Sequence, residues 1–148
     1  MVNGIEDLFP GLVGKDYQFT SPADEVYNCI AWAAGNSQDW WWPDARGRDY
    51  WPEGVPRVET VAAFIQAFAC IDFVPCDNES YEPGFEKIAL FATTRGQPKH
   101  AARQLVNGLW TSKLGRLEDI EHALHDLEGE EYGSVVQILK RPAAVPPA

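Results

Sequence analysis

Apolar side chains recur at helical spacing in one segment of the first half of the chain. In residues 57–71 they lie three to four positions apart, which is typical of the buried face of an amphipathic helix. Residues 21–35 predict a second helix with two possible starts, Ser21 followed by Pro22, or Asn28 as the N-cap. The residues leave both starts open.

The second half of the chain has the pattern of strands. Residues 87–93, KIALFAT, are a short apolar run that suits a buried strand. Residues 99–106 and 109–114 flank Asn107-Gly108, which is a strong signal for a β-hairpin.

The remaining segments complete an α+β layout. Residues 116–128 predict a helix with its apolar side chains on one face, and residues 134–140 predict a closing strand. N-terminal helices would then pack on a small antiparallel sheet. We expect one domain over residues 1–142 and a flexible, Pro-rich tail over residues 143–148.

Charge and composition narrow the function classes. A formal net charge of −10 argues against nucleic acid or an anionic membrane as a partner, because phosphate binding depends on clustered Lys and Arg. The chain has neither a secretory signal nor an apolar run near the roughly 18 residues of a membrane span, so we expect a cytoplasmic protein. Phosphate loops, nucleotide fingerprints and metalloprotease motifs are missing from the sequence, so we expect no cofactor and no metal.

The odd cysteine count and the position of Cys29 suggest thiol chemistry. Cys29, Cys70 and Cys76 are expected to be reduced. A thiol at a helix start feels the positive end of the helix dipole, which lowers the thiol pKa and favours the nucleophilic thiolate. This effect requires a helix start at Asn28, because a start at Pro22 would place Cys29 two turns inside. With the later start, the backbone N–H of Cys29, together with Asn28, would form an oxyanion hole.

His100 is the candidate base. It lies at the start of a predicted strand, far from Cys29 in sequence, and an imidazole there could accept the thiol proton. His122 and His125 lie three positions apart on the predicted acidic helix over residues 116–128. We expect them on a solvated face rather than at a metal.

The motifs around Cys29 and His100 are similar to those of a known superfamily. NCIAWA, followed much later by a strand that opens with His100, resembles papain-fold cysteine hydrolases of the NlpC/P60 and CHAP type. Longer segments, YNCIAWAAG, HAARQLVNGLWTSKLG and the final YG…LKRP, resemble a family of bacterial proteins of unknown function. The papain-like resemblance implies a papain-like α+β fold, with Cys29 as the nucleophile and His100 as the base. It implies a third polar residue near Ser112, where those families usually have His, Asn or an acidic residue.

The length of the Asn-Gly turn decides which residue faces His100. A two-residue turn would place Thr111 and Lys113 on that face, whereas a three-residue turn with the glycine in a left-handed bulge would place Ser112 there. Glu86, just before the first strand of the second half, is a further candidate for orienting the imidazole.

Aromatic residues crowd the loop over residues 36–56. Tryptophan combines a large apolar ring with a polar N–H and is frequent at binding sites, so Trp41, Trp42 and Trp51 are candidates for a substrate cleft. Covering a loop-rich core suits the same residues equally well.

The leading hypothesis is a cysteine-dependent hydrolase or transferase, similar to an amidase or peptidase. It would act on the amide or thioester bond of a peptide-like or acyl substrate. The alternative is a non-catalytic, immunity-type domain on the same scaffold, whose acidic surface binds a basic protein.

Overall fold

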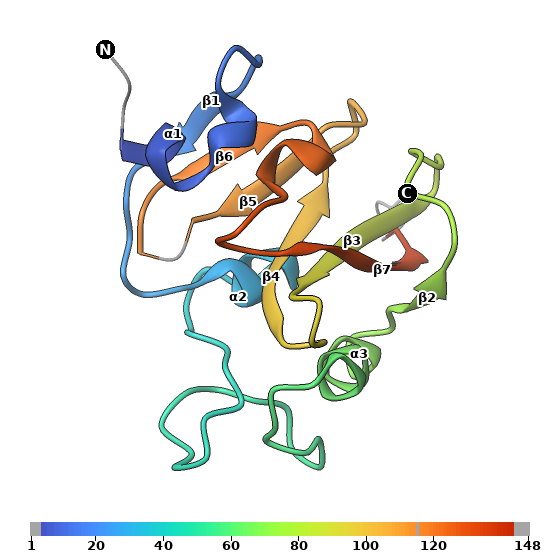
Figure 1. The fold of residues 1–148 in the computed structure, drawn as a ribbon. Coiled ribbons are helices and arrows are strands. Elements are labelled where there is room, and N and C mark those ends of the chain that lie inside the picture. The colour runs from blue at the N-terminus through green and yellow to red at the C-terminus, as the bar shows by residue number, and fades with distance from the viewer. Residues whose placement is uncertain (1–3, 115, 144–148) are drawn as a thin grey trace.

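The computed structural model describes residues 4–114 and 116–143. Its centre is a seven-stranded sheet in the order β1-β6-β5-β4-β3-β7-β2, and every pair of neighbours is antiparallel (Figure 1). The strands are β1 Gln18–Ser21, β2 Val74–Cys76, β3 Phe85–Ala92, β4 Pro98–Gln104, β5 Trp110–Lys113, β6 Asp119–His122 and β7 Ser134–Pro142. The helices are α1 Gly4–Leu8, η1 Pro10–Leu12, α2 Cys29–Ala33, α3 Val61–Ala69 and η2 Leu124–Leu127.

Both faces of the sheet are covered, which explains the unbroken apolar run in β3. Ile88 and Leu90 pack in the hydrophobic cluster that contains α2, α3 and the tryptophan loop. Ala89 and Phe91 alternate with them and pack in the cluster that contains α1, η1 and η2. The α+β class is therefore confirmed, although the sheet is larger and the helices are fewer than we expected. The β1 and β2 strands had no clear sequence signal.

The predicted helix over residues 116–128 is wrong. The segment forms β6 and the short turn η2, separated by Ala123. Ile120 pairs with Ser112 of β5, and the η2 side chains Leu124 and Leu127 are buried in the same hydrophobic cluster as Ile120. Hydrogen bonding to β5 on one side and β1 on the other outweighs the helical spacing of these apolar residues. The strands predicted over residues 87–93 and 134–140 are confirmed as β3 and β7.

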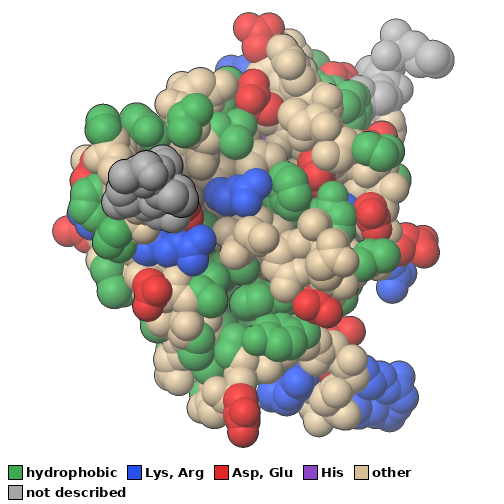
Figure 2. All heavy atoms as spheres, turned by 180° about the vertical axis from the view of Figure 1, so that it is seen from behind, with side chains coloured by type: hydrophobic (Ala, Val, Ile, Leu, Met, Phe, Trp, Pro, Cys, Tyr) green, Lys and Arg blue, Asp and Glu red, His purple; other side chains and the backbone are tan. Residues whose placement is uncertain are grey.

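The surface mixes both signs of charge. On the face in Figure 2, Asp and Glu side chains are scattered over the surface, and Lys and Arg side chains lie among them, including near the centre and at one lower edge. The net charge of −10 is therefore not concentrated in a single acidic patch on this face. No helix in the described ranges is long and apolar enough to cross a membrane. Most of the predicted tail, residues 144–148, lies outside the described residues.

Candidate functional site

Asn28 fixes the start of α2. It has extended backbone geometry, and its side-chain Oδ1 accepts a hydrogen bond from the N–H of Ala31 at 3.1 Å, as an N-cap does. The same carboxamide accepts from the Trp41 N–H at 3.1 Å and donates to the Trp41 carbonyl at 2.7 Å. The later of the two possible helix starts is therefore the one observed, and Cys29 is the first helical residue.

These bonds change the role expected for Asn28. Its side chain is 3 % exposed and is engaged with the helix end and with the backbone of the tryptophan loop. We therefore assign Asn28 to positioning Cys29 and Trp41 rather than to binding an oxyanion through its side chain.

The Cys29 thiol is buried, with 6 % of the residue exposed. Burial raises its pKa to about 11, although the backbone N–H groups of Ala101, Ile30 and Cys29 itself act in the opposite direction. The expected lowering of this pKa is wrong, because a helix of five residues offsets only part of the cost of burying a thiolate. Cys29 is a neutral thiol in the resting protein at neutral pH.

His100, Ser112 and His122 form a chain of hydrogen bonds across three neighbouring strands. His100 Nε2 lies 2.9 Å from Ser112 Oγ, and the same Oγ lies 2.7 Å from His122 Nε2. The His122 Nδ1 lies 2.8 Å from the carbonyl oxygen of Ala123. All three side chains in the chain are fully buried, whereas His100 Nδ1 has no hydrogen-bond partner.

The hairpin register explains why Ser112 meets His100. Arg103 pairs with Thr111, and Gly108 has a φ of 86°, so the turn is the three-residue, bulged alternative. Thr111 and Lys113 accordingly leave β5 on the opposite face from Ser112.

The alternative orienters have other partners. The Thr111 hydroxyl accepts a hydrogen bond from Trp32, and the Lys113 ammonium donates to the Asp24 carbonyl at 2.7 Å. Glu86 forms an ion pair with Arg141 at 2.8 Å.

Burial, together with neighbouring His122, holds the pKa of His100 well below its usual range. Burial also lowers the pKa of His122 to about 4, against a smaller contribution from its bond to Ala123. Both imidazoles are therefore neutral at neutral pH. Among the described residues, no group of three or more His, Cys, Asp or Glu side chains is arranged to hold a metal.

Cys29 and His100 are neighbours without a direct hydrogen bond. The thiol lies against the backbone N–H of Ala101, the residue after His100. Successive side chains of β4 leave on opposite faces, so Ala101 packs with α2 while His100 packs with Phe91. Tyr132 links the two, because its ring stacks on His100 at 4.0 Å and it lines the same pocket as Cys29.

The pocket at Cys29 has a volume of about 320 Å³. Its aromatic walls are Trp40, Trp42 and Tyr132, and Asp49 and Lys99 place one charge of each sign at its border. Trp42 therefore lines the same pocket as Cys29, and its role in substrate binding stays a prediction.

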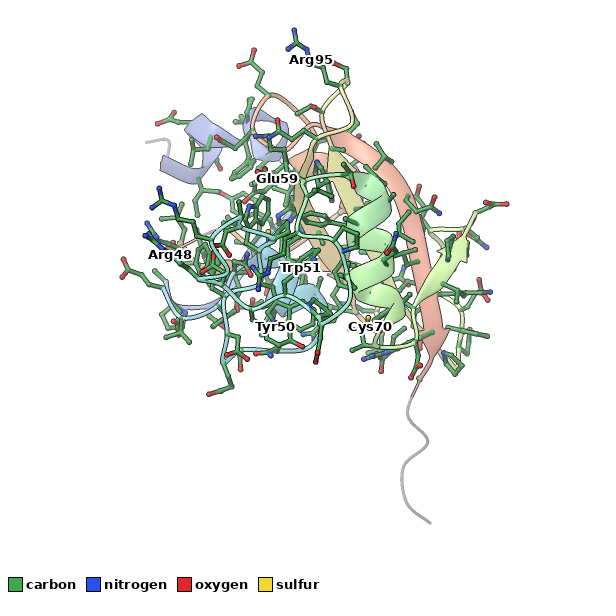
Figure 3. All side chains as sticks on the ribbon, turned by 90° about the horizontal axis from the view of Figure 1, so that it is seen from below. Arg48, Tyr50, Trp51, Glu59, Cys70 and Arg95 are labelled. Atoms are coloured by element: carbon green, nitrogen blue, oxygen red, sulfur yellow. The ribbon has the colours of Figure 1, made fainter. Side chains whose placement is uncertain are left out.

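Trp41 and Trp51 do not line this pocket. Each is 5 % exposed and belongs to the core cluster. The Trp51 indole donates to the Pro56 carbonyl at 3.1 Å and packs against Phe64 of α3. In Figure 3 Trp51 lies beside α3 in the interior, whereas Arg48 of the same loop lies at the periphery. Their assignment to substrate binding is corrected to a structural one.

Sequence reasoning missed two residues of this region: His122 and Tyr132. His122 was assigned to a solvated helix, but it is a strand residue with no exposed surface, while His125 is exposed. The alternation of Ile120 and His122 on one face of β6 was the available signal, although four residues are too few to outweigh a helical pattern. Tyr132 had no local signal.

A family model described as a domain of unknown function, DUF7689, matches residues 18–140. No curated protein and no solved structure matches the chain significantly.

Proposed function

The chain belongs to the DUF7689 family, and from its own geometry we propose that it is a cysteine-dependent hydrolase or acyl transferase with a papain-like arrangement. The observation that carries the proposal is the buried imidazole of His100. Its Nε2 is held by Ser112, its Nδ1 is left without a partner, and it lies one residue from the contact with the Cys29 thiol. The order of a helix-borne Cys, a strand-borne His and a polar residue on the next strand supports the papain-like assignment.

The pKa directions favour a base-assisted attack over a preformed ion pair. The thiol pKa is raised and the imidazole pKa is lowered, so the proton stays on sulfur in the resting state. When a substrate carbonyl enters the pocket, His100 Nδ1 accepts the thiol proton as the Cys29 sulfur attacks the carbonyl carbon. The imidazolium then gives this proton to the departing amine or thiol. Water or another acceptor next releases the acyl group from the sulfur.

The pocket suits an acyl group with an apolar side. Trp40 and Trp42 offer ring faces, and the apolar lining favours burial of hydrocarbon. A peptide-like amide or an acyl thioester presents such a group next to its carbonyl. Tyr132 covers the imidazole on the side where its ring stacks, which keeps water from that face.

Acyl transfer from 4-nitrophenyl acetate tests the proposal. The chain is used with Cys70→Ser and Cys76→Ser, so that the Cys29 thiol is the only thiol. Mass spectrometry should find one acetyl group on Cys29, and His100→Gln should slow its appearance by at least about tenfold. His125→Gln is the matched control, because the His125 ring is exposed and contacts Glu79 and Glu128 rather than any member of the chain of hydrogen bonds.

Equal acylation rates in the protein with and without His100 would remove the catalytic proposal. Absence of acetyl-Cys29, together with release of 4-nitrophenol no faster than in His100→Gln, would do the same and would leave the aromatic pocket as a binding site, which is the non-catalytic alternative.

A further inference from the structure

His122 is fully buried, although no step of the proposed reaction requires this residue. It has no exposed surface, lies on β6 two strands away from β4, and reaches His100 only through the Ser112 hydroxyl. The backbone pairing of β6 with β5 needs no imidazole at this position, because Trp110 and His122 pair through their main chains. Burying an imidazole is costly unless its nitrogens are bonded, and both nitrogens of His122 have partners.

The carbonyl of Ala123 sets the direction of every bond in the chain. A carbonyl oxygen can only accept, so the 2.8 Å contact requires a proton on His122 Nδ1. A neutral His122 then has a lone pair on Nε2, which accepts the Ser112 hydroxyl proton over 2.7 Å. The Ser112 oxygen is left to accept from His100 Nε2–H over 2.9 Å. His100 is consequently the Nε2–H tautomer, and its Nδ1 lone pair is free.

The opposite direction of hydrogen bonding along this chain is unfavourable. If His122 carried its proton on Nε2, the Nδ1 lone pair would face the Ala123 oxygen, and a buried hydrogen bond would be replaced by repulsion. The Ser112 hydroxyl would then donate to His100, which would hold its proton on Nδ1. That tautomer has no lone pair to accept the thiol proton.

We propose that His122 is a positioning residue that holds His100, through Ser112, in the tautomer with a free Nδ1 lone pair. The proposal deepens the proposed function, because the tautomer matters for acyl transfer only if His100 is the base. A neutral histidine performs here the orienting task that a carboxylate or amide performs elsewhere, and it adds no charge to the buried region.

The tautomer can be observed without any catalytic assay. Long-range ¹H–¹⁵N NMR spectra of the ¹⁵N-histidine protein at neutral pH distinguish a protonated from an unprotonated ring nitrogen. We expect His100 as the Nε2–H form and His122 as the Nδ1–H form. His122→Phe removes the acceptor for the Ser112 hydroxyl, so both His100 tautomers should be populated. His122→Gln offers a carbonyl acceptor to Ser112 and should restore the Nε2–H form.

Acylation of Cys29 provides the second measurement. Its rate should fall in His122→Phe to about half or less, in proportion to the lost Nε2–H population, and recover in His122→Gln. His125→Phe, which alters an exposed histidine, should change neither the spectrum of His100 nor the rate. Where His122→Phe does not fold, Ser112→Ala breaks the same chain at its middle and should also populate both His100 tautomers.

The outcomes separate the two proposals. A His100 that remains wholly Nε2–H in His122→Phe, or in Ser112→Ala, overturns the positioning role, whatever the acylation rate. A tautomer that shifts in these variants supports it, even if the wild-type protein transfers no acyl group and the proposed function fails.

Discussion

Replacement of His122 should make the fold less sensitive to acid. Burial lowers the pKa of His122 in the folded protein to about 4, whereas an unfolded chain titrates near the ordinary value of 6.5. As the pH falls below 6.5, His122 binds a proton in the unfolded state but not yet in the folded state. The free energy of unfolding therefore decreases until the folded form also binds a proton near pH 4.

The size of this loss of stability follows from the difference between the pKa values of His122 in the folded and unfolded states. The full gap corresponds to about 3 kcal/mol, because each pKa unit contributes about 1.4 kcal/mol. At pH 5 most of the unfolded chain is protonated at this site and most of the folded chain is not, so the loss there is about 2 kcal/mol. His122→Gln keeps a hydrogen-bond acceptor for Ser112 and has no proton to bind, so it should lack this part of the loss.

Urea unfolding at pH 7.5 and pH 5.0, at constant salt, measures the difference. His122→Gln should be less stable than the wild-type protein at pH 7.5, but its stability should fall by about 2 kcal/mol less between the two pH values. His100 is present in both proteins, so the part of its acid dependence that comes from burial, which is the larger part, cancels in the comparison.

His125→Gln is the control with the opposite sign. Glu79 and Glu128 raise the pKa of His125 against the effect of its burial, so this residue stabilises the fold in its charged form, at low pH. Its removal should increase the acid loss. Parallel pH dependences of the wild-type protein and His122→Gln would refute the argument that His122 is buried and neutral.

Three further predictions follow from the same structure. Iodoacetamide should alkylate Cys29 slowly at pH 7, because a pKa of about 11 leaves a thiolate fraction of about 10⁻⁴. The alkylation rate, measured by mass spectrometry, should rise up to about pH 10. A plateau below about pH 8.5 would contradict the raised pKa. Asn28→Ala removes the N-cap bond and both bonds to the Trp41 backbone, so urea unfolding should show a loss of about 1–3 kcal/mol, and an unchanged midpoint would argue against this role. Gly133 has a φ of 75°, and a methyl group there would collide with the Ala92 carbonyl oxygen. Gly133→Ala should therefore lower the free energy of unfolding by more than about 2 kcal/mol. Thermal stability equal to that of the wild-type protein would disprove this prediction.

Local sequence signals predicted several elements that carry the candidate site. The Asn-Gly turn predicted the hairpin that carries His100 and Ser112, because few residue pairs suit such a turn. The two possible starts of α2 were visible, as were the two registers of the hairpin. In each case the sequence offered a choice between two states of similar local energy. The contacts of Asn28 with Trp41 and the left-handed Gly108 show which state the fold adopts.

The sequence was least informative about burial. Trp41, Trp42 and Trp51 look alike along the chain, yet only Trp42 reaches the pocket, because the loop folds back and buries the other two against the core. The Cys29 pKa was predicted from the helix start alone. The dominant contribution is desolvation by segments distant in sequence, which no local pattern reports.

By itself, the sequence determined the α+β class, the central β3 strand and the β4–β5 hairpin, because apolar period and turn chemistry act over a few residues. Its resemblance to papain-fold hydrolases made Cys29, His100 and Ser112 candidates. Only the tertiary structure decided that residues 119–122 form a strand between β5 and β1, and that His122 joins His100 through Ser112. Helical spacing and strand pairing compete for the same apolar residues in that segment. Hydrogen bonds to two distant strands decide the competition, and those partners exist only once the chain has folded.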